Sequence, residues 1–179
     1  MFRSKTFIIF LCAFALLCSF YGDSYANSSE AFMSLPFGHM WTRTKLRMER
    51  SGAVTIAEKR GESLTMKGMF ENREALFSFN FVSKKGLSSK TVNVSSIGNP
   101  QDDRALYDVL KMAFENRFGR GQERSMVGAG NSIALRSQWS PDQHTSIVLS
   151  YNPNTKRFSD NLAVDSPIRL SYVTSRWSN

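Results

Sequence analysis

Cysteine is almost absent from this sequence. Its two cysteines, Cys12 and Cys18, both precede Ala26, where we expect a leader peptide to end. If this leader is removed, the remaining chain has no disulfide, no thiol nucleophile and no cysteine ligand for a metal. Its stability must then come from a hydrophobic core, for which residues 27–179 are numerous enough. A chain that needs no disulfide suits the bacterial periplasm, whereas small secreted eukaryotic domains are usually cross-linked.

Long hydrophobic runs are also missing, with one exception at the N-terminus. Phe7 to Tyr21 is a run of 15 apolar or small residues, preceded by Arg3 and Lys5 and followed by Ser24-Tyr25-Ala26. Small residues at positions 24 and 26 are what a signal peptidase recognises. Because a membrane-spanning helix needs about 20 residues, the sequence predicts a signal peptide over 1–26 and a periplasmic or secreted protein. An uncleaved anchor is the alternative.

Histidine is scarce, since His39 and His144 are the only two. They do not form a His-x-His or His-Glu-x-x-His spacing, so we predict no metal site and no cofactor. Asp142 and His144, with one of the many serines, have the composition of a hydrolase triad. The sequence has no Gly-x-Ser-x-Gly motif, however, and Asp142 follows Pro141 as a turn residue does. We therefore predict a non-enzymatic protein and keep a hydrolase that uses His144 as an alternative.

Acidic residues are outnumbered by basic ones. The chain has 23 Lys and Arg against 15 Asp and Glu, and loss of the leader takes its formal charge from +8 to +7. A charge of this sign attracts anionic partners over long range. In a cell envelope these are acidic proteins, acidic polymers, lipid head groups and lipopolysaccharide phosphates, and nucleic acid is not expected. The alternative is that the charge only maintains solubility.

Two amphipathic helices are predicted. The first covers 40–51 and ends at Gly52, and the second covers 101–118 and ends at Gly119. The residues expected on the buried face of the first helix are Met40, Trp41, Thr44 and Met48. Those expected on the buried face of the second are Leu106, Val109, Leu110, Ala113 and Phe114. The first helix also carries a basic stripe with spacing i, i+4 and i+7, formed by Arg43, Arg47 and Arg50.

Each predicted helix is followed by four segments in which apolar and polar residues alternate, the pattern of a strand with one buried face. After the first helix these segments are 53–58, 63–70, 74–82 and 87–96. After the second they are 122–127, 131–139, 144–152 and 167–174. The apolar positions sharing one face include Phe77, Phe79, Phe81, Ile147, Leu149, Tyr151, Ile168, Leu170 and Tyr172. Short connections between most of these segments predict antiparallel hairpins.

The sequence therefore predicts an α+β fold made of two tandem α-β-β-β-β units. We place the first unit at 40–98 and the second at 99–179, after an N-terminal extension over 27–39, with 27–179 as a single compact domain. The strands are expected to form one antiparallel sheet with both helices on one face. The other face of this sheet is expected to be partly open to water.

This order of elements resembles the tandem helix-plus-four-strand architecture of the β-lactamase inhibitor protein family, to which the outer-membrane assembly lipoprotein BamE is often likened. The resemblance covers most of 27–179 at the level of element order. The inhibitor's disulfides and the lipidated cysteine of BamE are missing here, and no motif matches residue by residue, so no functional residue is carried over. The resemblance implies that the open sheet serves as a protein-binding surface.

We predict a binding module that recognises an envelope protein through the open sheet face, with an exposed apolar and aromatic patch ringed by Arg and Lys. The alternative is an envelope factor that binds anionic lipid or lipopolysaccharide through the stripe of Arg43, Arg47 and Arg50.

Three further residues are candidates for binding. Arg120 and Arg124 belong to the glycine-rich stretch 119–132, which either cradles an anionic group with backbone N–H donors or forms hairpin turns. Trp177 lies beside Arg176 near the C-terminus. It is either an exposed anchor for a partner or a side chain that folds back on the sheet.

Overall fold

The computed structural model describes residues 28–127, 133–153, 156–159 and 162–177 of the chain. The predicted signal peptide, both cysteines and positions 128–132 of the glycine-rich stretch lie outside these residues. Within the described part, no helix combines the length and the apolar character that crossing a membrane requires.

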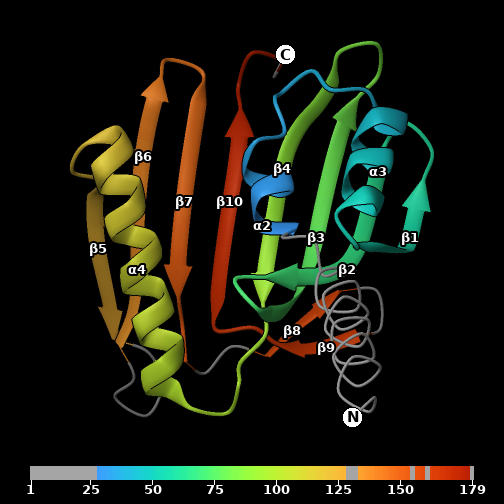
Figure 1. The fold of residues 1–179 in the computed structure, drawn as a ribbon. Helices are drawn as coiled ribbons and strands as arrows, with labels where there is room; N and C mark the ends of the chain where they lie inside the picture. Colours follow the sequence, from blue (N-terminus) through green and yellow to red (C-terminus); the bar gives the residue numbers. More distant parts are fainter. Residues whose placement is uncertain (1–27, 128–132, 154–155, 160–161, 178–179) are drawn as a thin grey trace, which may run out of the picture.

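An eight-stranded antiparallel sheet forms the body of the protein (Figure 1). In chain order its strands are β1 (Val54–Lys59), β2 (Ser63–Phe70), β3 (Arg73–Val82), β4 (Gly86–Val94), β5 (Gln122–Val127), β6 (Ile133–Asp142), β7 (Thr145–Tyr151) and β10 (Ile168–Thr174). Their order in space is β1-β2-β3-β4-β10-β7-β6-β5. The predicted α+β class and antiparallel sheet are confirmed. A separate two-stranded sheet of β8 (Lys156–Ser159) and β9 (Leu162–Asp165) was not predicted.

Three helices lie on the same face of this sheet (Figure 1). They are α2 (Ser28–Met33), α3 (Trp41–Arg50) and α4 (Pro100–Phe118). The start of α4 follows from its sequence, because the side chain of Asn99 accepts a hydrogen bond from the Gln101 N–H and Pro100 suits a first turn. The six residues of α2 are too few to show a helical period, and this helix was not predicted.

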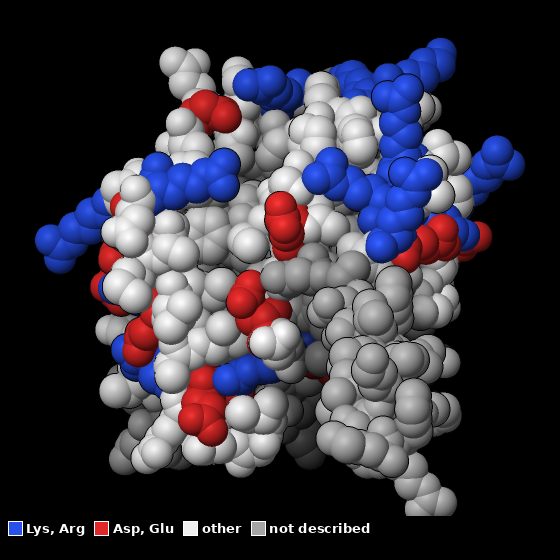
Figure 2. Space-filling model, viewed as in Figure 1, with Lys and Arg blue, Asp and Glu red and all other residues white. Residues whose placement is uncertain are grey.

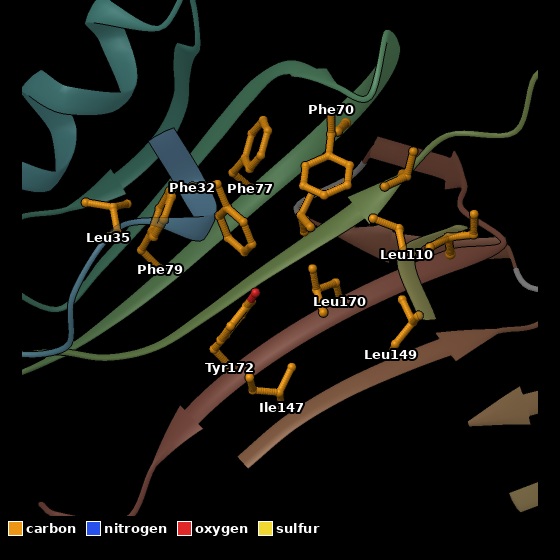
Figure 3. Packing of buried hydrophobic residues seen from close by; sticks show 14 of the residues in the cluster. Phe32, Leu35, Phe70, Phe77, Phe79, Leu110, Ile147, Leu149, Leu170 and Tyr172 are labelled. Carbon is orange, nitrogen blue, oxygen red and sulfur yellow. The ribbon is translucent and has the colours of Figure 1, made fainter. Parts of the chain in front are cut away.

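The hydrophobic core lies between the helices and the sheet (Figure 3). Phe32 of α2 is fully buried at its centre. Its ring lies 5.5–6.2 Å, centroid to centroid, from the rings of Phe70, Phe77, Phe79 and Tyr172. Tilted and edge-to-face pairs of this kind stabilise beyond their buried area. A short helix is therefore held firmly by one aromatic side chain.

The strand residues predicted to share the core face are buried. Phe77, Phe79 and Phe81 of β3 have this position, and so have the apolar residues at alternate positions of β7 and β10. Because side chains alternate between the faces of a sheet, the residues between them point away from the helices.

The buried face of α4 matches the prediction in part. Leu110 and Phe114 are buried and Leu106 packs partly buried against the core, as predicted. Val109 and Ala113 are exposed, and Asp103 and Tyr107 are buried in addition. Two polar side chains occupy buried positions because both are hydrogen-bonded. Asp103 accepts from Arg73 and Ser96, and the Tyr107 hydroxyl lies 2.8 Å from Ser137 Oγ. In α3, Thr44 and Met48 are buried as predicted, but Met40 is 52% exposed.

The segment between α2 and α3 pairs with the start of β4. The Gly38 N–H donates to the Leu87 carbonyl at 3.0 Å, and the Leu87 N–H donates to the His39 carbonyl at 2.9 Å. Gly86 lies directly beneath this crossing with φ +85°, and a Cβ there would lie 2.3 Å from the Gly38 carbonyl oxygen. Only glycine fits at this close approach of two backbones.

Candidate functional site

The sheet face opposite the helices, here called the open face, is polar. Ser78 and Asn80 of β3 point to it, because Phe77 and Phe79 point into the core. The hydrogen-bonding side chains at these alternate positions are Thr65, Ser78, Asn80, Ser89, Thr91, Gln138, Ser146, Ser150 and Ser171. No aromatic residue is among the exposed large hydrophobic residues of the described chain. The aromatic residues predicted for this face are therefore not found among the exposed ones, whereas Val54, Met126 and Val173 are exposed apolar side chains at its edges and strand ends.

Three arginines lie in one cross-strand row on the open face. Arg124 of β5 is directly opposite Arg136 of β6. Arg136 is opposite Ser150 of β7, which is opposite Arg169 of β10. We call Arg124, Arg136 and Arg169 the arginine row. All three are exposed.

The arginine row carries positive charge without a counter-charge in the described part of the chain. Arg124, Arg136 and Arg169 take part in none of the ion pairs found among the described residues. Like charges directly opposite each other on a sheet are destabilising. The pair Arg124 and Arg136 therefore costs the free protein stability, and a bound anion would remove that cost.

Two shallow depressions mark the surface along this row, and Arg136 borders both. One is lined by Gln122, Arg124, Arg136 and Gln138. The other is lined by Arg136, Val148, Ser150, Arg169 and Ser171. Side chains that offer hydrogen bonds thus alternate with guanidinium groups, so an anionic ligand would meet donors of both kinds.

Hydrogen bonds on the open face orient one end of the row. Arg169 Nε donates to Ser171 Oγ at 3.1 Å, and Thr91 Oγ1 donates to the same oxygen at 3.1 Å. The first of these bonds uses only the Nε–H of the Arg169 guanidinium, which leaves its terminal nitrogens for a ligand.

Of the arginine row, only Arg124 was a candidate from the sequence, because it belongs to the glycine-rich stretch 119–132. Arg136 and Arg169 were missed because each is a lone arginine in a strand, and only the register brings them into line. The available signal was that both occupy polar positions between buried residues, Leu135 and Ser137 for one and Ile168 and Leu170 for the other. Arg120 lies in the connection between α4 and β5 and is exposed, outside the row.

The predicted stripe on α3 is a second basic surface, on the helix face. Arg43, Arg47 and Arg50 are all exposed. Figure 2 shows Lys and Arg side chains gathered over the region of α3, at the upper right of the view. Arg47 donates to Ser34 Oγ at 2.7 Å. Partial burial and the charges of Arg47 and Arg43 lower the pKa of His39 below its ordinary value.

Trp177 folds back against the protein. Its side chain is half-buried, and a Cβ built on Gly38 would lie 3.5 Å from its Cη2 atom. The last described residue of the chain therefore packs beside the segment that joins α2 to α3.

His144 lies in the exposed turn between β6 and β7. Asp142 Oδ1 accepts a hydrogen bond from the backbone N–H of His144 at 2.8 Å, and Oδ2 accepts from Thr145 Oγ1 at 2.9 Å. These bonds lower the pKa of the Asp142 carboxyl. Asp142 thus acts as a turn residue, and none of the hydrogen bonds found in the described chain involves the His144 imidazole. No three His, Asp or Glu side chains of the described residues gather as metal ligands.

Comparisons with protein-family models, with curated proteins and with solved structures gave no match.

Proposed function

We propose that the protein is an exported, non-enzymatic binding module that recognises another protein through the open face of its sheet. The observation that carries this proposal is the arginine row, in which Arg124 and Arg136 face each other without a counter-charge among the described residues. A costly arrangement of exposed charges is typical of a binding surface, where a partner supplies the missing charge. Export through a signal peptide over 1–26 and a periplasmic location are part of the proposal.

We propose that the sheet consists of two tandem helix-plus-four-strand units joined at its centre. The strand order supports this division. β1 to β4 run in sequence from one edge to the centre, and β5, β6, β7 and β10 run in sequence from the other edge to the centre. The β8-β9 pair is an insertion before the last strand of the second unit. The arginine row then belongs entirely to the second unit.

Photo-crosslinking from defined faces of the protein tests the proposed function. A photoreactive amino acid replaces Gln138 on the open face or, as a matched control, Val109 on the exposed side of α4. The full chain with its leader is expressed, and the envelope is irradiated. We expect a discrete crosslinked protein from position 138 and none from position 109. Equal crosslinking from both positions, or crosslinking from position 109 alone, would refute recognition through the open face.

A second candidate function is binding of anionic lipid or lipopolysaccharide through Arg43, Arg47 and Arg50. It is favoured by the exposure of all three residues and by the basic surface around α3 in Figure 2. Each Lys or Arg near an anionic bilayer contributes about 1 kcal/mol. Binding of this kind falls steeply with salt.

Co-sedimentation with vesicles tests the second candidate. Vesicles that contain anionic phospholipid are compared with purely zwitterionic ones, at low and at high salt. If the stripe binds lipid, replacement of Arg43, Arg47 and Arg50 by Gln abolishes sedimentation with the anionic vesicles at low salt. If the triple variant sediments as the unchanged protein does, the stripe has no such function.

A further inference from the structure

We infer that the ligand of the arginine row is an acidic, extended segment of the partner protein, whose carboxylates bind Arg124, Arg136 and Arg169. This inference rests on the proposed function and specifies the chemistry of the partner. It follows from the unpaired charge of the row, from its spacing and from the kind of side chains that surround it.

Among the described residues, the basic side chains of this cross-strand row lack an ion-pair partner only in the second half of the sheet. In the first half of the sheet, Lys67 of β2 lies in the same cross-strand row and forms an ion pair with Glu74 of β3 at 2.9 Å. In the second half, the described residues offer no such carboxylate to Arg124, Arg136 or Arg169. The place where an acidic ligand fits is therefore confined to β5, β6, β7 and β10.

The spacing of the row matches an extended peptide that crosses the strands. Adjacent strands lie about 4.8 Å apart, so the backbones at Arg124 and Arg169, three strands apart, are separated by about 14 Å. In an extended chain, side chains on one side repeat about every 6.7 Å. Carboxylates at positions i and i+4 are then about 13 Å apart and reach both ends of the row. A carboxylate at i+2 lies within reach of the long side chain of Arg136.

The residue types favour a peptide over a membrane surface. A guanidinium group binds a carboxylate through two parallel hydrogen bonds, which fixes geometry as well as charge. Gln122, Gln138 and Ser150 lie between the arginines and offer donors and acceptors to a peptide backbone. Surfaces that insert into lipid carry Trp, Phe and Leu. The large hydrophobic residues exposed in the described chain include no Trp or Phe, and Leu46, the leucine among them, lies on α3 and not on the open face.

A peptide-binding experiment tests the inference. The probe is a fluorescent peptide of five core residues with Glu at positions 1, 3 and 5, and the control peptide carries Gln there. Binding to the purified protein is followed by fluorescence anisotropy. We expect the Glu peptide to bind and the Gln peptide not to bind. Arg136→Gln is expected to weaken binding at least tenfold, and Arg60→Gln, an exposed arginine in the β1-β2 turn, is expected to leave it unchanged.

Three outcomes would overturn the inference. One is equal weakening by Arg136→Gln and Arg60→Gln, because binding would then follow net charge alone. Another is failure of the Glu peptide to bind at all. The third is binding of anionic vesicles, but not of the peptide, in a manner that depends on Arg136. Circular dichroism of both variants establishes that they are folded. If a protein crosslinks from position 138 but the Glu peptide does not bind, the proposal of a binding module stands and only the inference of an acidic ligand is refuted.

Discussion

Lys90 lies beneath the end of α2 and is 2% exposed. Its ammonium group has three N–H donors, and they bind the carbonyl oxygens of Phe32, Met33 and Leu35 at 2.7, 3.0 and 2.8 Å. Its nitrogen also lies 4.5 Å from the centroid of the Tyr172 ring. A buried charge is tolerated here because each of its protons has an acceptor. Lys90 thus caps the C-terminal end of α2. Among the described residues, no other side chain donates a hydrogen bond to these three carbonyls.

Replacing Lys90 by Met is expected to lower the free energy of unfolding by about 3 kcal/mol. The methionine fills much of the same space but leaves three carbonyl groups without a donor. Urea denaturation measures this loss. Lys67→Met is the control, because Lys67 is 54% exposed and its pair with Glu74 contributes little. A loss for Lys90→Met no larger than that for Lys67→Met would contradict the helix-closing role.

The same residue predicts how stability changes with pH. Burial, followed by the charges of Arg47 and Arg117, lowers the pKa of Lys90 from 10.5 to about 7. Between pH 7 and 9 the unfolded chain keeps this proton and the folded protein loses it, so the free energy of unfolding rises with pH. Tyr172, whose pKa is raised by burial, stays protonated in this range. We expect the slope in urea titrations to be smaller in Lys90→Met, and an unchanged slope would refute the assignment.

At the scale of the elements, the crossing of two backbone segments at Gly86 constrains how α3 is attached to the sheet. Gly86 has φ +85° and would place a Cβ 2.3 Å from Gly38. Gly98 has nearly the same φ, +86°, and a Cβ there would meet nothing within 4 Å. Alanine substitutions at Gly86 and Gly98 therefore distinguish the free-energy cost of the backbone conformation from that of the steric contact.

Gly86→Ala is expected to lower the free energy of unfolding by about 3 kcal/mol or more, because backbone strain and a clash add together. Gly98→Ala is expected to cost about 1 kcal/mol, the strain alone. Thermal or urea unfolding of both variants measures the difference. Equal losses would mean that the segment around Gly38 moves away at no cost.

The sequence allowed the eight strands of the main sheet and the helices α3 and α4 to be located, because strict alternation and capping residues are local signals. It placed Leu110 and Phe114 of α4 correctly but missed Asp103 and Tyr107, because these two are buried through hydrogen bonds that local apolarity does not reveal. For the candidate site, Arg136 and Arg169 are 33 positions apart in the sequence, and their alignment depends on the order of strands in the sheet. Such long-range register is not encoded in any short stretch of sequence.

At the scale of the whole molecule, the two facing arginines of the open face lower the stability of the free protein. Arg136→Gln removes the repulsion between two facing arginines, so we expect the free protein to gain about 0.2–1 kcal/mol at low salt. This gain is expected to shrink at high salt, where exposed charges are screened. Urea denaturation at two salt concentrations measures it, with Arg60→Gln as the control. A loss of stability on Arg136→Gln would mean that this arginine has a structural role.

The position of β10 sets the time at which the protein can finish folding. This strand is the last of the described strands along the chain, yet it lies between β4 and β7 in the middle of the sheet, where Thr91 donates a hydrogen bond to Ser171 across 80 positions of sequence. Until residue 174 has left the ribosome, β4 and β7 each present an unpaired edge. The two halves of the sheet can therefore join only after β10 has been synthesised. A chain built in this order keeps the two halves of its sheet separate until β10 becomes available to both.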